Sequence, residues 1–364
     1  MNPSVYLTSQ TSMMASIGSP LPGPERVGTS RTSAPEVATR SLDPNPAPTV
    51  TDVAYIGGAG RSGSTVLALL IGQLPGFVAA GGLSNLWERG LQENYLCGCG
   101  VHFRECAFWE QVGREAFGGW DALDANELVR LKFAVTKYRH YPWHLAPRLR
   151  PKFFAQLVEY SDYMARLYAA IKSVSGCRVV IDTSHDVLPA LLLRRMPSVH
   201  GRILHLVRDS RGVAFSLSKR VPRAEVTTTP TYMSRYAPAQ AGLEWVVANL
   251  PYHVLRTRSL PRLRIHYESL VASPATEIPR IIEFLGERLS PSELSILEGD
   301  SIEITENHMV SGNPHRLGVS HVQVRLDDEW RGGMRPKDRM IVTLLTWPLG
   351  LAYGYMGNRP RGRP

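Results

Sequence analysis

The pattern of apolar and polar positions predicts several buried strands, each followed by a helix. An apolar, β-branched run occupies 53–56 and, after a glycine-rich stretch, an apolar run continues without a breaker to Pro75. Similar runs occupy 178–182, 202–207 and 263–267. Continuous apolar runs of this length are typical of parallel strands that are buried on both faces. The pattern therefore predicts an α/β fold.

A helical insertion is expected at 108–174. Apolar residues recur there at spacings of three and four, and no proline interrupts 127–141 or 152–174. Insertions of this kind often wall off a substrate pocket. The aromatic residues of the insertion, Tyr138 among them, suit an aromatic or lipid-like acceptor and suit ordinary core packing equally well.

One domain is expected over 51–358. Residues 1–50 are dominated by Ser, Thr, Pro, Gly and Ala, which predicts a disordered leader or a misassigned translation start, and 359–364 should be a disordered tail. The leader lacks the charged and apolar regions of a secretory signal. No apolar run reaches the roughly 18 residues of a membrane span. A soluble, cytoplasmic protein is therefore expected.

The glycine-rich stretch between the first strand and its helix combines glycines with an arginine and hydroxyl side chains, at Gly57, Gly58, Gly60, Arg61, Ser62, Gly63, Ser64 and Thr65. Glycine permits positive φ and lets the backbone approach a ligand closely. The helix that follows presents unpaired N–H groups and the positive end of its dipole. The segment Gly60, Arg61, Ser62, Gly63, Ser64, Thr65 is therefore predicted to bind an anion.

The absence of a lysine helps to identify which anion the loop binds. Residues 58–65 have the spacing G-x-x-x-x-G-K-[ST] of nucleotide hydrolases, but Ser64 stands where the lysine should be. Enzymes that cleave between the β- and γ-phosphates use that lysine, so its absence counts against an ATPase, GTPase or kinase. Asp182, at the end of the second long strand, is the best support for the kinase alternative because it could hold Mg²⁺.

A second basic site is expected after the third long strand. Arg208 ends that strand, and Ser216 follows eight residues later, once a helix has begun. A guanidinium and a hydroxyl that converge from two elements form a phosphate clamp.

Three segments in this order resemble the PAPS-dependent sulfotransferases, which use 3′-phosphoadenylyl sulfate. The loop RSGST at 61–65 resembles their 5′-phosphosulfate loop, and RDSRGVAFS at 208–216 resembles their motif R-D-P-R-G-x-x-x-S, with Ser210 replacing the proline. The segment NHMVSGNPHRL at 307–317 resembles the loop that closes over the nucleotide. The resemblance covers about 52–357.

The resemblance implies a three-layer, P-loop-like fold with a mostly parallel five-stranded sheet. It also implies transfer of a sulfuryl group from PAPS to a phenolic or alcoholic hydroxyl of a small-molecule acceptor, such as a secondary metabolite, without a metal. The loop, including Arg61, would hold the phosphosulfate. Arg208 and Ser216 would hold the 3′-phosphate, and Arg316 would reach the nucleotide.

The general base is less evident, because Gly82 and His185 stand where many relatives carry a glutamate and a lysine. Histidine titrates near neutrality, so His185 is the first candidate for the base, Glu88 the second and His102 the third. The alternative for His185 is a helix cap. A protein without a working base would bind PAPS or its product without catalysing transfer.

The positive net charge of the chain is compatible with an acidic ligand. Lys and Arg number 41 against 32 Asp and Glu, a net charge of +9. The cations are scattered and not interleaved with aromatic residues, so we expect no nucleic-acid partner.

Three of the four cysteines, Cys97, Cys99 and Cys106, cluster in the spacing C-x-C-x₆-C. With His102 nearby, the spacing is only a weak match to a zinc site. A local disulfide and packed thiols are the alternatives, and a cytoplasmic location favours packed thiols. No metal is expected on this basis.

Overall fold

The computed structural model describes residues 50–227, 231–254, 260–297, 299, 301–304, 307–317 and 320–356. Apart from residue 50, the predicted leader lies outside these ranges, as does the predicted tail. Within these ranges, no helix combines the length and apolar character that a bilayer crossing requires.

Five parallel strands form the central sheet, in the order β2-β3-β1-β4-β5. They are β1 (Thr51–Gly57), β2 (Phe77–Gly81), β3 (Val179–His185), β4 (Val199–Val207) and β5 (Arg262–His266). Since all five run in one direction, their carboxyl ends meet at one edge, where α/β folds bind ligands. The predicted α/β fold with a parallel five-stranded sheet is confirmed.

The sheet is buried on both faces, as its apolar runs predict. Along β1, Val53 and Tyr55 belong to one core cluster, and Ala54 and Ile56 belong to a second. Successive strand residues point to opposite faces, so both sets must be covered by helices.

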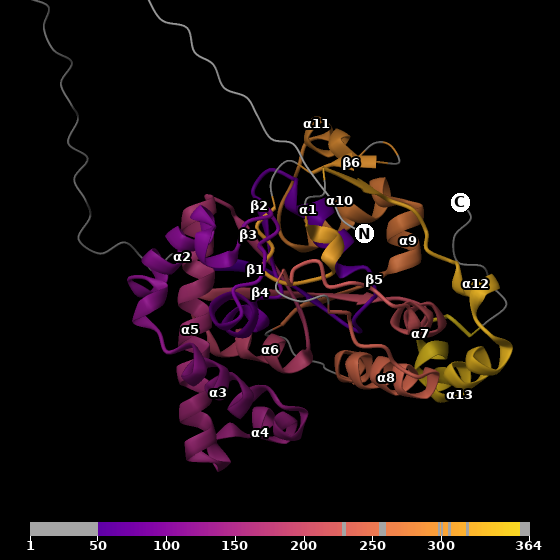
Figure 1. Ribbon diagram of the computed structural model, residues 1–364, viewed down its shortest axis with the longest axis horizontal. Helices are drawn as coiled ribbons and strands as arrows, with labels where there is room; N and C mark the ends of the chain where they lie inside the picture. The colour runs from indigo at the N-terminus through magenta and orange to yellow at the C-terminus, as the bar shows by residue number, and fades with distance from the viewer. Residues whose placement is uncertain are drawn as a thin grey trace, which may run out of the picture. The chain divides into compact units, whose positions relative to one another are not determined.

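Helices form a layer on each face of the sheet, as Figure 1 shows. The helices that flank the sheet are α1 (Ser64–Gly72), α9 (Tyr267–Ala272) and α10 (Pro274–Phe284) on one face, and α5 (Pro151–Ser175) and α6 (Val187–Leu192) on the other. A further group, α7 (Ser210–Ser218), α8 (Pro238–Val254) and α13 (Pro336–Ala352), packs together beyond the end of β4. The smaller helices and strands are α11 (Pro291–Leu294), α12 (Trp330–Gly333), and the antiparallel pair β6 (Ser301–Glu303) and β7 (His321–Gln323).

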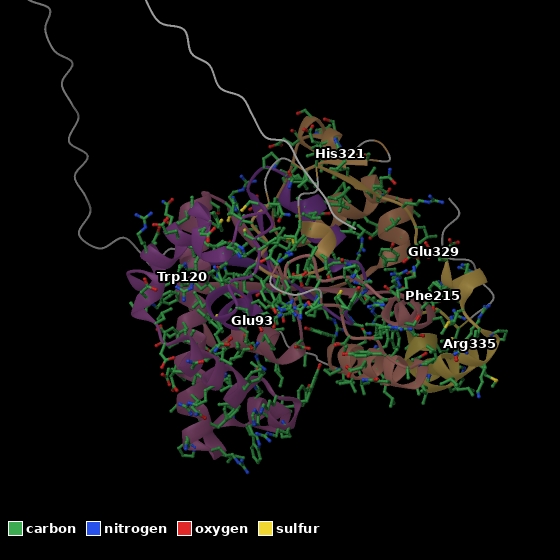
Figure 2. The ribbon with its side chains drawn as sticks, viewed as in Figure 1. Glu93, Trp120, Phe215, His321, Glu329 and Arg335 are labelled. Atoms are coloured by element: carbon green, nitrogen blue, oxygen red, sulfur yellow. The ribbon has the colours of Figure 1, made fainter. Side chains whose placement is uncertain are left out.

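The segment predicted as an insertion contains α2 (Ala107–Phe117), α3 (Ala125–Thr136), α4 (Tyr141–Leu145) and α5. The helix expected over 127–141 is broken, because Lys137 is extended (φ −77°, ψ 139°) and ends α3 at Thr136. Aromatic side chains fill the space between these helices, and Trp120 (Figure 2) donates its indole N–H to the Trp109 carbonyl at 2.9 Å.

Short helical turns connect the remaining elements. The 3₁₀ turns are Leu83–Asn85, Phe103–Glu105, Trp120–Ala122, Tyr138–His140, Pro147–Leu149, Leu193–Arg195, Ser295–Leu297 and Pro314–Arg316, and the π-helix is Leu86–Gln92.

A buried histidine in β4 makes stability depend on pH. His205 is fully buried, donates from Nε2 to Asn249 Oδ1 at 3.0 Å and stacks on Tyr252. Burial, helped by the charges of Arg262 and Arg264, lowers its pKa to about 3. The unfolded chain, with a histidine pKa near 6.5, therefore binds more protons than the folded chain between about pH 3 and 6.5.

We expect His205 to remove about 2 kcal/mol of unfolding free energy between pH 7 and pH 5. Urea unfolding at the two pH values measures this loss, and His205→Gln should abolish that share of it. The exposed His200 provides a matched control, because His200→Gln should leave the pH dependence intact. Equal pH dependence in wild type and His205→Gln would contradict the assignment.

Candidate functional site

The loop from β1 to α1 has a backbone that needs glycine at particular positions. Gly58 has φ 128° and Gly63 has φ 95°, both in the region that L side chains rarely adopt. A Cβ on Gly58 would lie 2.4 Å from the Leu206 carbonyl oxygen, and one on Gly63 would lie 2.5 Å from the Tyr267 ring. The loop is therefore pressed against β4 and α9, and it delivers the N-terminus of α1 to the carboxyl edge of the sheet.

The loop brings together the three predicted anion-binding side chains. Arg61, itself at φ 66°, donates from Nε to Ser216 Oγ at 3.0 Å. Arg208 donates from Nη1 to the Arg61 carbonyl oxygen at 3.1 Å. The Arg61 guanidinium thus lies beside the hydroxyl of α7, and the Arg208 guanidinium binds the backbone of the same loop.

Arg208 is held in a mostly buried place. It is 5% exposed, its guanidinium lies 4.5 Å from the centre of the Tyr267 ring, and it pairs with Asp327 Oδ2 at 3.0 Å. Burial, followed by the charge of Arg208, lowers the pKa of Arg61. Two guanidinium groups so close together favour an anion between or beside them.

The other residues of the loop are in part buried and in part open to a ligand. Ser62 is buried, and within the described ranges its Oγ has no hydrogen-bond partner. Thr65 Oγ1 accepts from the Asn313 N–H at 3.2 Å, so the turn near the end of the chain packs onto the start of α1. A Cβ on Gly60 would meet no atom of the described chain within 4 Å, so the backbone there faces open space.

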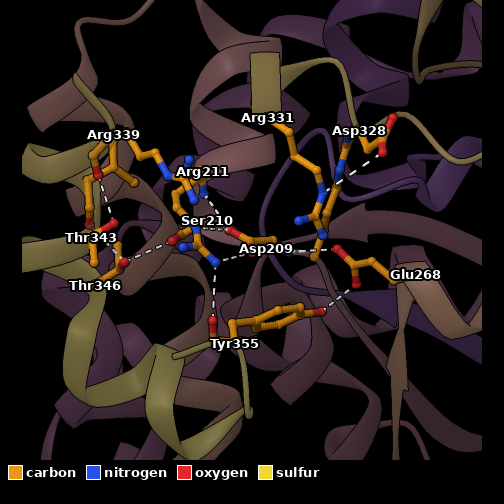
Figure 3. A network of polar contacts seen from close by, with 12 residues as sticks. Asp209, Ser210, Arg211, Glu268, Asp328, Arg331, Arg339, Thr343, Thr346 and Tyr355 are labelled. Carbon is orange, nitrogen blue, oxygen red and sulfur yellow. Dashed lines mark hydrogen bonds and ion pairs between the residues drawn. The ribbon is translucent and has the colours of Figure 1, made fainter. Parts of the chain in front are cut away.

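A polar network behind Arg208 fixes the turn from β4 into α7 (Figure 3). Arg211 donates hydrogen bonds from Nε and Nη2 to the two carboxylate oxygens of Asp209. The Asp209 N–H donates to Glu268 Oε1 at 3.0 Å. Ser210 Oγ lies 2.8 Å from Thr346 Oγ1 of α13. The serine that replaces a rigid proline is therefore anchored by a hydrogen bond to a neighbouring helix.

His185 lies next to the loop. It ends β3 with φ 68°, and its Nε2 is 3.4 Å from Ser64 Oγ. Burial and the positive charge of Arg89 lower its pKa to about 4, so its imidazole is neutral at pH 7. The residue that precedes α6 is Asp186, so His185 is not the helix cap of the alternative prediction.

Two side chains of the insertion bind the carboxylates of Glu88 and of Asp186, the residue that follows His185. Lys132, on the buried side of α3, donates to Glu88 Oε1 at 2.6 Å, and Tyr138 donates to Asp186 Oδ1 at 3.1 Å. The second candidate base, Glu88, is thus engaged in a largely buried ion pair. The third, His102, bonds the Asn94 carbonyl oxygen at 2.6 Å instead.

Arg316 is buried within the closing turn. Its guanidinium is 1% exposed and donates to the carbonyl oxygens of Met309, Leu96 and Val310. These bonds fold the turn back on itself, because backbone carbonyls in a buried turn need donors. Arg316 therefore holds the closing turn. Among the described residues its Nη1 has no hydrogen-bond partner, so its contact with a nucleotide stays a prediction.

Asp182 likewise has a structural task. It is fully buried and accepts hydrogen bonds from the Leu83 N–H, the Ser184 N–H and hydroxyl, and the Tyr168 hydroxyl. Both carboxylate oxygens are used within the chain, which removes the main support for a magnesium-dependent kinase.

Arg89, Lys132 and Asp327 are site residues that the sequence did not reveal. Arg89 donates to Ser311 Oγ at 2.8 Å and acts on the pKa of His185. The sequence held one sign that Lys132 has a special role, because a charged side chain stands there on the apolar face of a predicted helix. The sequence held no such sign for Asp327, because this residue lies 119 positions along the chain from its partner Arg208.

A cavity of about 470 Å³ lies beside α7 and is lined by Phe215 and Arg335 among others (Figure 2). It borders the helix that carries Ser216, but neither the loop nor His185 lines it.

The loop geometry predicts different effects for two neighbouring glycines. Gly63→Ala should lower the melting temperature by several degrees, because its Cβ would collide with the Tyr267 ring at a positive φ. Gly60→Ala is the control and should leave the melting temperature nearly unchanged, since its Cβ meets open space. Thermal unfolding followed by circular dichroism measures both, and equal melting temperatures would refute this account of the loop.

Comparisons with known proteins identify the family. The model of the sulfotransferase family matches residues 54–291. No curated protein matches the sequence. Solved structures that resemble the chain include the sulfotransferase domain of the olefin synthase of Synechococcus PCC 7002, at 19% identity and a TM-score of 0.45 over 85% of this chain and 98% of that one. The sulfotransferase domain of the curacin biosynthetic pathway matches at 17% identity and a TM-score of 0.46, over 83% and 98% of the two chains.

Sulfotransferase STF9 of Mycobacterium avium matches at 12% identity and a TM-score of 0.41, over 86% of this chain and 79% of that one. Structures that are this distantly similar give no information about the substrate or the mechanism of this chain. The family model, by contrast, covers well over half of the 364 residues and includes the loop, His185, Arg208 and Ser216. The chain belongs to the sulfotransferase family.

Proposed function

We propose that the protein transfers a sulfuryl group from PAPS to a hydroxyl of a small-molecule acceptor. Family membership supports sulfotransfer in general. The choice of donor rests on one observation: in the loop that precedes α1, the Arg61 side chain binds Ser216 and the Arg61 carbonyl oxygen binds Arg208. Two guanidinium groups, a hydroxyl and free helix N–H groups suit a ligand with a phosphate at each end.

The two phosphate groups would be held by different elements. The amides of the loop, with Arg61, Ser64 and Thr65, would hold the 5′-phosphosulfate. Arg208 and Ser216 would hold the 3′-phosphate, which would compete with the Asp327 carboxylate for the Arg208 guanidinium. In sulfuryl transfer, charge develops on the oxygen between phosphorus and sulfur, and Arg61 would stabilise it.

His185 would act as the base. The acceptor hydroxyl gives its proton to Nε2, the acceptor oxygen bonds to sulfur, and the bond from sulfur to the phosphate oxygen breaks. The product nucleotide leaves with that electron pair. An imidazole with a pKa of about 4 is neutral at pH 7 but is a weak base. Acidic hydroxyls such as phenols should therefore be sulfated faster than alkyl alcohols.

Arg208 provides a test of donor binding. Arg208→Ala should weaken binding of the product 3′-phosphoadenosine 5′-phosphate at least tenfold, about 1.4 kcal/mol, because a charge-assisted contact is lost. Isothermal titration calorimetry measures the affinity. Arg202→Ala is the matched control. Arg202 lies in the first half of β4, where it pairs with Asp52 of β1, so this variant should bind the nucleotide as wild type does. Unchanged affinity in Arg208→Ala would remove this residue from the site.

His185 provides a test of the chemical step. Asparagine tolerates the positive φ of this position, so His185→Asn should keep nucleotide affinity while kcat falls by about 10²–10⁴. For wild type, kcat/KM should stay level from pH 8 to about pH 5 and fall near pH 4, where the ring becomes protonated. The exposed His200→Asn is the control. A fall centred near pH 6.5, or full activity in His185→Asn, would exclude His185 as the base.

A non-catalytic nucleotide-binding protein is the second candidate, favoured by the glycine at position 82. Incubation with ³⁵S-labelled PAPS and a panel of phenols and alcohols separates the two. A labelled acceptor supports the enzyme. Tight nucleotide binding without a labelled product across the panel supports the binding protein, and magnesium-dependent ATP turnover would contradict both.

A further inference from the structure

Three cysteines and a histidine from distant parts of the chain meet outside the donor site. Cys97 and Cys99 lie in a tight turn, Cys106 directly precedes α2, and His308 comes 202 residues later, just before the closing turn. Their three sulfur atoms and one imidazole nitrogen all lie within 4.8 Å of one another. All four cysteines of the chain are free thiols.

Three of the separations between ligand atoms are close to the edges of a tetrahedron around a zinc ion. Zn–S bonds of about 2.3 Å and a Zn–N bond of about 2.0 Å at tetrahedral angles put two sulfurs about 3.8 Å apart and a sulfur and nitrogen about 3.5 Å apart. Cys99 Sγ lies 3.7 Å from Cys106 Sγ. His308 Nδ1 lies 3.4 Å from Cys106 Sγ and 3.8 Å from Cys97 Sγ. A disulfide, by contrast, requires about 2.0 Å.

The donor set selects the ion. Thiolates and imidazole are soft or borderline ligands that suit Zn²⁺, whereas Mg²⁺ and Ca²⁺ prefer oxygen. Three cysteines and one histidine complete four-fold coordination and leave no open position, which is typical of structural zinc sites. We propose that Cys97, Cys99, Cys106 and His308 bind one structural Zn²⁺.

The surroundings hold the ligands in place. The Cys97 N–H donates to the Val101 carbonyl oxygen at 2.8 Å and closes the turn. The His308 ring stacks on Phe108 with centres 4.7 Å apart and planes 9° apart. The Trp109 indole donates to the His308 carbonyl oxygen at 2.9 Å. Such outer contacts orient metal ligands in established sites. Cys99 is exposed, which gives the ion a path of entry.

The ion would join the start of the insertion to the closing turn. The Gly98 N–H already donates to the Met309 carbonyl oxygen at 3.1 Å, and the same turn reaches Thr65 of α1 through Asn313. A metal that fixes His308 would therefore steady the segment that packs on the anion-binding loop. This role is structural, because four protein ligands would fill the coordination sphere of the ion.

Metal analysis of the full chain, expressed without a polyhistidine tag, tests the proposal. After gel filtration in zinc-free buffer, wild type should carry about one zinc per chain by inductively coupled plasma mass spectrometry. Cys106→Ser and His308→Ala should carry below about 0.1. Cys177→Ser is the matched control, since Cys177 is buried but outside the cluster, and it should keep its zinc.

A second measurement does not depend on how the variants fold. Wild type reconstituted with Co²⁺ should show the thiolate charge-transfer and tetrahedral d–d bands of sulfur-bound cobalt. Removal of zinc by a chelator should lower the melting temperature by at least about 5 °C. Three results would each overturn the proposal: wild type that holds below about 0.1 zinc after incubation with excess zinc, cobalt spectra without thiolate bands, or an intact mass about 2 Da low that reveals a disulfide. None of these readouts uses sulfotransfer activity, so a failure here leaves the proposed function standing.

Discussion

The structure depends on keeping two guanidinium groups together at the carboxyl edge of the sheet. Arg61 and Arg208 are joined through the Arg61 carbonyl oxygen, and Arg208 is 5% exposed. Burying a charge next to a like charge costs several kcal/mol unless partners offset it. Here the Asp327 carboxylate and the Tyr267 ring offset part of the cost. The remaining positive charge favours an anion at this edge. Arg61 is held there at φ 66°, a backbone conformation that residues other than glycine seldom adopt.

Much of the fold could be predicted because its signals are local. The buried runs of β1 and β4 and the helix spacing of α5 each follow from neighbouring residues, and parallel strands then bring their ends to one edge. This is why Arg208 and Ser216, predicted from spacing alone, lie at the same loop as Arg61. The sequence did not predict that the helix breaks after Thr136, because no glycine or proline stands next to the extended Lys137.

The roles of single polar residues were harder to predict, because they depend on partners far along the chain. The sequence of the closing turn gave no sign that Arg316 donates hydrogen bonds to the buried carbonyl oxygens of Leu96, Met309 and Val310. His102 was the nearest histidine to the cysteines in sequence, but it bonds the Asn94 carbonyl oxygen. Spacing identifies residues on one element, whereas such pairings depend on how separate elements pack.

Two departures from the family pattern have different physical consequences. At position 210 the hydrogen bond to Thr346 compensates for the missing proline, so the turn that carries Arg208 is still fixed. At Gly82 nothing steric excludes a side chain, since a Cβ there would have only ordinary contacts beyond 3.4 Å and φ is −82°. The absence of a carboxylate therefore concerns chemistry and not packing. Without one beside it, the surroundings of the His185 ring are burial and the positive charge of Arg89, which together lower its pKa to about 4 and leave the ring neutral at pH 7.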